Sequence, residues 1–171
     1  MIHVTSLSGL ADLAASLGPV DLLTLLSPSA EPRDWDGLAR GHHLQLAFHD
    51  IVVPTPGLIA PDGDTMQAIL DFGREGGAER PMLIHCWAGI SRSSAAAYVI
   101  ACERNPGFEN EIADELRQRS PLVTPNSLMV QIEDELLGRN GAMTDANIRI
   151  GRGADAFEGA SYQLPLVWPL K

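Results

Sequence analysis

The 171-residue sequence has few of the features that mark secreted, membrane or nucleic-acid-binding proteins. Its two cysteines, Cys86 and Cys102, are too few for a disulfide framework. No apolar run approaches the roughly 18 residues of a membrane-spanning helix, and no basic start leads into an apolar leader. Twelve basic and 22 acidic side chains give a net charge of −10, and Lys171 is the only lysine. We therefore expect no nucleic acid and no membrane as partner, and a soluble cytoplasmic protein.

Metal-binding patterns are also missing. The five histidines include His3 and the pair His42 and His43, none of which forms a spaced ligand set with a cysteine or a carboxylate. We therefore expect no metal, and nothing in the sequence calls for another cofactor. What the sequence does have is an ordinary globular composition, with 45% hydrophobic residues and a length that suits one domain with a sizeable core.

Hydrophobic periodicity predicts alternating strands and helices. Strands are indicated over 2–4, 20–26, 44–48 and 82–84. Helices are indicated over 8–17, 64–76, 92–104, 109–119 and 126–138. We expect a three-layer α/β fold in which helices flank a central, mainly parallel sheet of four or five strands. The chain 1–171 is interpreted as a single domain with its core in about 20–138; the Gly-rich tail 139–171 has no assigned structure, and its apolar patch 164–168 is a candidate to pack on the core.

One stretch, from Pro81 to Ser94, carries the chemistry. An apolar run ends at His85 and Cys86, a loop of small residues follows, and an alanine-rich helical stretch begins at about Arg92. A strand, a tight loop and a helix start form an anion cradle, because the loop N–H groups and the positive end of the helix dipole point at the same place. A thiol at the mouth of this cradle loses its proton easily, since the same groups stabilise the thiolate.

Spacing within this stretch predicts a phosphate site. Five residues separate Cys86 from Arg92, so the arginine can fold back from the first helical turn and hold two oxygens of a tetrahedral anion. Gly89 lies where the backbone must turn closely past the ligand, and Ser93 can donate to the sulfur when it leaves. The alternative is a turn with a buried structural cysteine, which needs neither the arginine nor the glycine at these positions.

The sequence HCWAGISRSS, which starts at His85, resembles the signature of the protein tyrosine phosphatase superfamily and in particular of its dual-specificity branch. Residues 119–126 resemble the turn that leads that branch into its closing helix, so the resemblance covers roughly 20–138. It implies a phosphotyrosine protein phosphatase-like fold and a cofactor-independent hydrolase that forms a phosphocysteine on Cys86. The implied partner is a phosphoprotein or a small phosphomonoester, and phosphate, sulfate or vanadate is expected to occupy the loop.

The resemblance also implies roles for individual residues. Arg92 clamps the phosphate, and Ser93 assists the departing thiolate. His85 is implied to support the loop through a bond to backbone near the cysteine, and Asn126 is a second supporting residue. The residues implied to bind substrate, mainly through backbone N–H groups, are Trp87, Ala88, Gly89, Ile90, Ser91 and Arg92.

A carboxylic acid is also expected, because an alkoxide or phenolate is a poor leaving group until it is protonated. Asp50 is the predicted general acid: it follows the strand 44–48 and precedes a Pro-rich loop, where the resemblance implies the acid. Its separation of 36 residues from Cys86 is longer than is usual in that branch. Asp62 and Asp64 are the alternatives, although turn and helix-cap chemistry already explains them; a site with no dedicated acid is the third possibility.

Two other functions fit parts of the pattern. A phosphoprotein-binding pseudophosphatase would keep the cradle and lose turnover, whereas a rhodanese-type sulfurtransferase usually lacks this cysteine-to-arginine arrangement. The loop carries no positive charge at Trp87, Ala88 and Ile90, which argues against polyphosphate lipid substrates. We expect Trp87 to point into the core, Trp35 to pack rather than form a lid, and Cys102 to be a core residue.

Overall fold

The computed structural model describes residues 1–31, 35, 37–38 and 41–169, so part of the loop predicted over 27–40 lies outside the described residues. At its centre is a five-stranded sheet in the order β3-β2-β4-β1-β5. The strands are β1 (Ile2–Thr5), β2 (Asp21–Leu26), β3 (His43–Ala47), β4 (Met82–His85) and β5 (Tyr162–Leu164). β1 to β4 are parallel to one another, and β5 is antiparallel to β1. The predicted mainly parallel sheet is confirmed.

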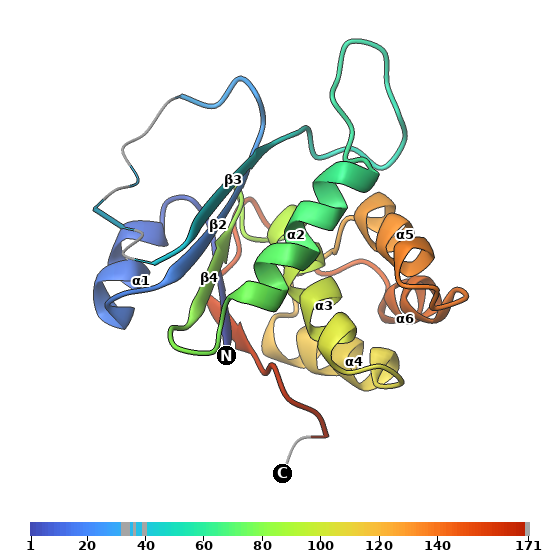
Figure 1. The fold of residues 1–171 in the computed structure, drawn as a ribbon. Helices are drawn as coiled ribbons and strands as arrows, with labels where there is room; N and C mark the ends of the chain where they lie inside the picture. The colour runs from blue at the N-terminus through green and yellow to red at the C-terminus, as the bar shows by residue number, and fades with distance from the viewer. Residues whose placement is uncertain (32–34, 36, 39–40, 170–171) are drawn as a thin grey trace.

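Helices flank the sheet on both sides (Figure 1). They are α1 (Leu10–Leu17), α2 (Gly63–Glu75), α3 (Arg92–Arg104), α4 (Glu109–Arg119), α5 (Ser127–Leu136) and α6 (Ala142–Ile150). Successive strand residues point to opposite faces, so Leu22 joins the smaller core under α1 and Leu23 joins the larger core under the other helices. The three-layer α/β prediction is therefore confirmed. No helix of the described residues is long and apolar enough to cross a membrane.

The carboxyl ends of the four parallel strands meet at one end of the sheet. β1 leads into Ser6, β2 into Ser27, β3 into Phe48 and β4 into Cys86. The register places the exits of β1 and β4 level, because His85 is paired with Thr5, whereas β2 and β3 run two residues further, past the Thr24 that is paired with His85. Ligands of open parallel sheets bind outside the carboxyl ends of the strands, so the fold brings the predicted site to the expected end.

Helix α3 is the centre of the larger helical layer. It packs against α2, α4 and α5 as well as β1 and β4, and its residues from Arg92 to Cys102 are all buried. The alanines of this helix allow close approach on every side, which explains why the sequence here has no polar face. Its N-terminus directly follows the loop after β4, so the most enclosed helix of the fold carries the predicted anion site.

The segment 139–169 adds two elements that the sequence does not indicate. α6 packs against α4 and α5, and β5 extends the sheet beside β1. Leu164 and Leu166 are buried in the larger core, so the apolar patch predicted as a candidate does pack there. The larger core also includes Ile2 and Val4, and it therefore draws on residues on both sides of the 20–138 range.

Candidate active site

Cys86 is the first residue after β4 and lies at the bottom of the loop. It is only 2% exposed. The N–H of Gly89 donates to its Sγ at 3.3 Å, and Ser93 Oγ lies 3.1 Å from the same sulfur. Both contacts come from the loop and the first turn of α3, and both groups can donate to a negatively charged sulfur. The sequence predicted this arrangement of cysteine and serine.

The loop carbonyls are held away from the loop centre by three surrounding segments. Trp87 O accepts from Leu7 N at 3.0 Å, and Ala88 O accepts from Gly159 N at 2.8 Å. Ile90 O and Ser91 O accept from Thr124 N at 3.1 Å and Asn126 N at 3.4 Å. In a trans peptide the N–H points opposite to the C=O. Carbonyls that face outward therefore turn the N–H groups of residues 88, 89, 91 and 92 inward, as an anion site requires.

Gly89 is required at its position by the backbone that surrounds it. Its φ is +72°, a conformation that side-chain-bearing residues rarely adopt. A Cβ here would lie 2.8 Å from Ser6 N and 2.9 Å from the carbonyl carbon of Thr5. The close approach is thus to the backbone that follows β1, and it packs the loop against the N-terminal segment of the chain.

Arg92 folds back from α3 as predicted. Its Nη1 donates to Phe48 O at 2.8 Å and to Ser27 Oγ at 3.3 Å, which fixes the guanidinium between the ends of β2 and β3. The guanidinium carbon also lies 5.9 Å from the ring centre of Phe48. Its Nε is buried and has no hydrogen-bond partner among the described residues. An unpartnered buried N–H of a cation is a group that an anion would satisfy.

Asp50 faces this arginine from the segment after β3. Its Oδ2 lies 3.8 Å from Arg92 Nε, while its Oδ1 accepts from Ser91 Oγ at 2.7 Å and from Asn126 Nδ2 at 2.8 Å. Asn126 in turn caps α5 by accepting from Met129 N at 3.1 Å. Ser91, Asn126 and Arg92 therefore hold the carboxylate beside the loop, although the side chain remains 36% exposed.

The two alternative acids lie elsewhere. Asp62 is the N-cap of α2, where its carboxylate accepts from Thr65 N and Thr65 Oγ1 and these bonds lower the pKa of Asp62. Asp64 is an exposed residue in the first turn of the same helix. Neither side chain lines the cleft that contains Cys86, whereas Asp50 does. The turn and cap interpretation of these two residues agrees with their surroundings.

His85 is fully buried beneath the loop. Its Nε2 lies 2.9 Å from Thr24 Oγ1, and its Nδ1 lies 3.4 Å from Cys86 O. The ring of Trp35 packs on it with centroids 5.3 Å apart. His85 therefore ties the cysteine backbone to β2, which suits a supporting residue. Trp35 is buried, in agreement with the packing interpretation.

Comparisons with known proteins give matches in structure only. No protein-family model and no curated protein sequence matches the chain. DUSP15 superimposes with a TM-score of 0.55 at 18% identity over 86% of this chain and 88% of that one. The Yvh1 phosphatase domain from Chaetomium thermophilum gives 0.56 at 17% identity over 82% and 92%. PTPMT1 in complex with PI(5)P gives a TM-score of 0.59 at 13% identity over 81% of this chain and 89% of that one.

The chain has the fold of the dual-specificity phosphatases. The resemblance noted in the loop sequence is thus matched by the arrangement of strands and helices around it. At these identities the superpositions establish the fold alone, so any activity must be argued from this chain's own residues.

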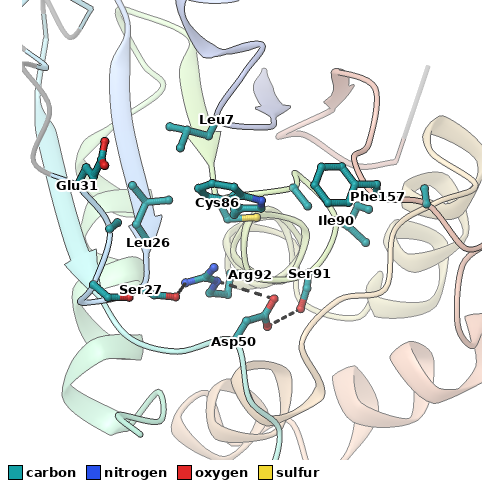
Figure 2. A pocket seen from close by; sticks show the side chains of 15 residues that line it. Leu7, Leu26, Ser27, Glu31, Asp50, Cys86, Ile90, Ser91, Arg92 and Phe157 are labelled. Atoms are coloured by element: carbon teal, nitrogen blue, oxygen red, sulfur yellow. Dashed lines mark hydrogen bonds and ion pairs between the residues drawn. The ribbon is translucent and has the colours of Figure 1, made fainter.

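The dual-specificity phosphatase fold here encloses a cleft of about 720 Å³ above Cys86. Figure 2 shows Leu26, Ser27 and Glu31 on one side of the cysteine, Ile90 and Phe157 on the other, and Asp50 with Arg92 below. The cleft lining includes Ala156 and Phe157, which belong to the unassigned tail. Sequence reasoning missed them because nothing in a short polar and Gly-rich segment indicates where it will pack.

One prediction about the loop is wrong. Trp87 does not enter the core; it is 58% exposed and lines the cleft. Its carbonyl is bonded to Leu7 N, and the adjacent Cys86 occupies the buried position at the end of β4. Since neighbouring residues in extended chain alternate sides, the indole is directed outward. The sequence could not show this, because a tryptophan is common in either setting.

Cys102 lies in the last turns of α3 and is fully buried. Burial raises the pKa of its thiol, and the nearby Glu109 acts in the same direction. It belongs to the larger core, as predicted. Within the described residues, no group of three or more histidine, cysteine or acidic side chains is arranged to hold a metal ion.

Proposed function

We propose that this protein hydrolyses phosphate monoesters through a phosphocysteine on Cys86, in the manner of the protein tyrosine and dual-specificity phosphatases. The observation that carries the proposal is the buried Nε of Arg92, which has no hydrogen-bond partner among the described residues, beside a cysteine that already accepts from the N–H of Gly89. A tetrahedral dianion at this point would receive the arginine N–H and the inward N–H groups of the loop. No cofactor takes part in the proposed reaction.

In the first step the thiolate of Cys86 attacks phosphorus. An S–P bond forms as the P–O bond to the leaving group breaks, and the electron pair of that bond stays on the leaving oxygen. Asp50, as the acid, gives this oxygen its proton. Arg92 and the loop N–H groups hold the three equatorial oxygens, where charge is greatest in the transition state. Asp50 and Cys86 both line the cleft, so the sulfur can attack phosphorus while the carboxylic acid protonates the leaving oxygen.

In the second step water attacks the phosphocysteine. Asp50, now a carboxylate, accepts a proton from the water, the S–P bond breaks and inorganic phosphate leaves. The sulfur departs with the electron pair as a thiolate, and Ser93, 3.1 Å from it, donates a hydrogen bond to that charge. Asn126 and Ser91 serve as positioning residues for Asp50, because both donate to its Oδ1.

The test is hydrolysis of phenyl phosphate and p-nitrophenyl phosphate by the wild type, Cys86→Ser and Asp50→Asn. The serine variant is expected to be inactive. Asp50→Asn is expected to lose about 10²-fold in kcat on phenyl phosphate and much less on p-nitrophenyl phosphate, whose leaving group needs little protonation. Asp64→Asn, on the exposed first turn of α2, is the matched carboxylate control and should retain activity on both substrates.

Two results would contradict the proposal. A wild type that binds vanadate but hydrolyses neither ester would be a phosphate-binding protein without turnover. Equal losses on the two esters in Asp50→Asn would remove Asp50 from the role of general acid while leaving the nucleophile in place. The second outcome would favour a mechanism with no dedicated acid.

A further inference from the structure

Two large aromatic side chains stand exposed at the mouth of the cleft. Trp87 follows the nucleophile directly and is 58% exposed, and Phe157 is 84% exposed. Both line the cleft above Cys86. Exposure of one large apolar side chain is ordinary, but two that border one cleft make an apolar surface for a ligand to cover.

Phe157 is held there by a segment that is tied to the loop at several points. We call residues 156–161 the strap. Its Gly159 N–H donates to Ala88 O at 2.8 Å, and Ser161 Oγ lies 2.8 Å from Thr5 Oγ1. Glu158 Oε1 accepts from Ser6 Oγ at 2.5 Å and also from Ser8 Oγ. An exposed phenylalanine directly before these anchors is presented to the cleft rather than left on a free loop.

The strap also has no room to move closer to the loop. A Cβ at Gly159 would lie 3.3 Å from both Gly89 O and Ile90 Cγ1, so the two backbones are already near contact distance. The strap backbone two residues after Phe157 is therefore held against the loop that follows Cys86. A contact made by Phe157 with a substrate would depend on the same backbone that holds the phosphate.

The two aromatics form a ridge rather than the wall of one cavity. On the far side of the cleft they border a second hollow of about 150 Å³, which is lined also by Leu7, Ser8 and Glu158. A ligand anchored by its phosphate at Cys86 can lay its body against this ridge. The ridge is apolar, so a ligand with an apolar body gains binding free energy by covering it.

The charges in the cleft also favour a ligand that carries a single phosphate. Arg92 is the only cation among the described residues that line it, and Asp50 and Glu31 are acidic. One phosphate can be bound by Arg92 and the loop, but a second phosphate would find no further cation among the described lining residues and would face Glu31. Polyanionic esters are thus disfavoured on electrostatic grounds.

We propose that the strap is a substrate-recognition element, and that Phe157 together with Trp87 selects phosphomonoesters with an aromatic or other apolar body over small alkyl and polyanionic esters. This proposal rests on the proposed function, since it assumes that the phosphate binds at Cys86 and Arg92. It adds two specificity-determining residues and a segment far from the signature loop in sequence.

The test compares the dissociation constants of three non-hydrolysable ligands, measured by titration calorimetry on the whole chain. Methylphosphonate carries only the anion, benzylphosphonate adds an aromatic ring, and propane-1,3-bisphosphonate adds a second anion. We expect benzylphosphonate to bind about 10- to 50-fold more tightly than methylphosphonate, as burial of part of a ring against apolar surface predicts. The bisphosphonate is expected to bind more weakly than methylphosphonate.

Variants then assign the preference to the ridge. Phe157→Ala and Trp87→Ala should each reduce the benzyl-to-methyl preference by about 3- to 10-fold, and Phe157→Leu should restore most of it. Val167→Ala is the matched control, because Val167 is an exposed apolar residue of the same C-terminal segment that does not line the cleft. Its preference should equal that of the wild type.

The outcomes separate the two proposals. Equal affinity of the wild type for the methyl and benzyl ligands would overturn the inference and leave the phosphatase function intact if p-nitrophenyl phosphate is still hydrolysed. A preference that survives in both alanine variants would also overturn it. Absence of both hydrolysis and phosphonate binding would overturn the proposed function, and this inference with it.

Discussion

Helix α3 has a cysteine at each end, and the two differ in everything except burial. Cys86 precedes the helix by one short loop and is 2% exposed; Cys102 lies near its C-terminus and is 0% exposed. Cys86 receives the N–H of Gly89 and has the Ser93 hydroxyl within 3.1 Å, and it forms the floor of a cleft. Cys102 lies in the larger core, where burial raises the pKa of its thiol.

The difference shows that burial alone does not decide whether a thiol is chemically available. The N-terminal end of a helix supplies N–H donors and a positive potential, whereas the C-terminal end supplies carbonyls and a negative potential. One end of α3 therefore presents N–H donors to Cys86, whereas burial in the core raises the pKa of Cys102 near the other end. A single helix thus sets opposite conditions for two residues of the same kind.

The largest expected effect is on hydrolysis. Cys86→Ser should lower kcat by on the order of 10⁴-fold or more, because a hydroxyl at this position is a far weaker nucleophile than a thiolate. Cys102→Ala should retain activity and lose about 1 to 2 kcal/mol of unfolding free energy to the small cavity it creates. Steady-state kinetics and urea denaturation measure the two quantities; comparable activity losses in both variants would break the contrast.

Alkylation should distinguish the cysteines without mutation. In the folded protein at pH 7, iodoacetamide should modify Cys86 at least about 100-fold faster than Cys102, and vanadate should protect Cys86. Peptide mass spectrometry gives the extent of modification at each site over time. Equal rates in the native protein, in the absence of denaturant, would show that the difference between the ends of α3 has no chemical consequence.

A smaller effect is expected when only the donor to the sulfur is removed. Ser93→Ala should slow breakdown of the phosphocysteine by about tenfold while leaving its formation nearly unchanged, because the hydroxyl stabilises the departing thiolate. Rapid-mixing experiments with p-nitrophenyl phosphate should then show a burst of nitrophenol followed by a slow steady state. Ser127→Ala, an exposed hydroxyl at the start of α5, is the control and should behave as the wild type does. Loss of the burst itself would contradict this assignment of the serine.

Burial also changes the protonation of a carboxylate, and there the expected effect is on stability only. Glu133 on α5 is fully buried, and neither of its carboxylate oxygens has a partner among the described residues. Burial raises the pKa of Glu133 to about 8. Between pH 4.5 and 8 the folded protein therefore keeps a proton that the unfolded chain has released, so this group lowers stability progressively as pH rises through that range.

Glu133→Gln removes that titration. The unfolding free energy of the variant should exceed that of the wild type slightly at pH 5 and more at pH 8. Each kcal/mol recovered should raise Tm by about 2–4 °C. Hydrolysis should be unchanged, since Glu133 does not line the cleft. Thermal unfolding at several pH values gives the comparison; a difference in Tm that is constant with pH would refute the linkage.

Much of the fold followed from periodicity because its elements are regular. β2 and β4 are mostly apolar and buried on both faces, and α4 shows its inward stripe with Ile112 and Leu116. The loop spacing predicts Cys86 as the nucleophile and Arg92 as its clamp, and the family resemblance predicts Asp50 as the acid from its position after a strand. Its contacts with Ser91 and Asn126 are long-range, so the sequence alone could not contain them.

The missed parts have physical reasons as well. β5 has only three residues, so a period of two has no length in which to appear. The strap has no hydrophobic pattern because its side chains make specific polar contacts at a surface, and Phe157 is exposed. Trp87 is expected in the core, but the buried position beside it belongs to Cys86. These are cases in which tertiary context decides.

The bonds from Leu7 and Gly159 to the loop carbonyls bear on when, during synthesis, the chain can first bind phosphate. Residues 5–8 are made long before Cys86, whereas the strap is made about seventy residues after it. A nascent chain that has just exposed Cys86 lacks the strap, the edge strand β5 and the residue that bonds Ala88 O. Cys86, the predicted nucleophile, is thus synthesised well before the residues that surround it. Competence to bind phosphate should arise late, when residues up to 164 can pair with β1.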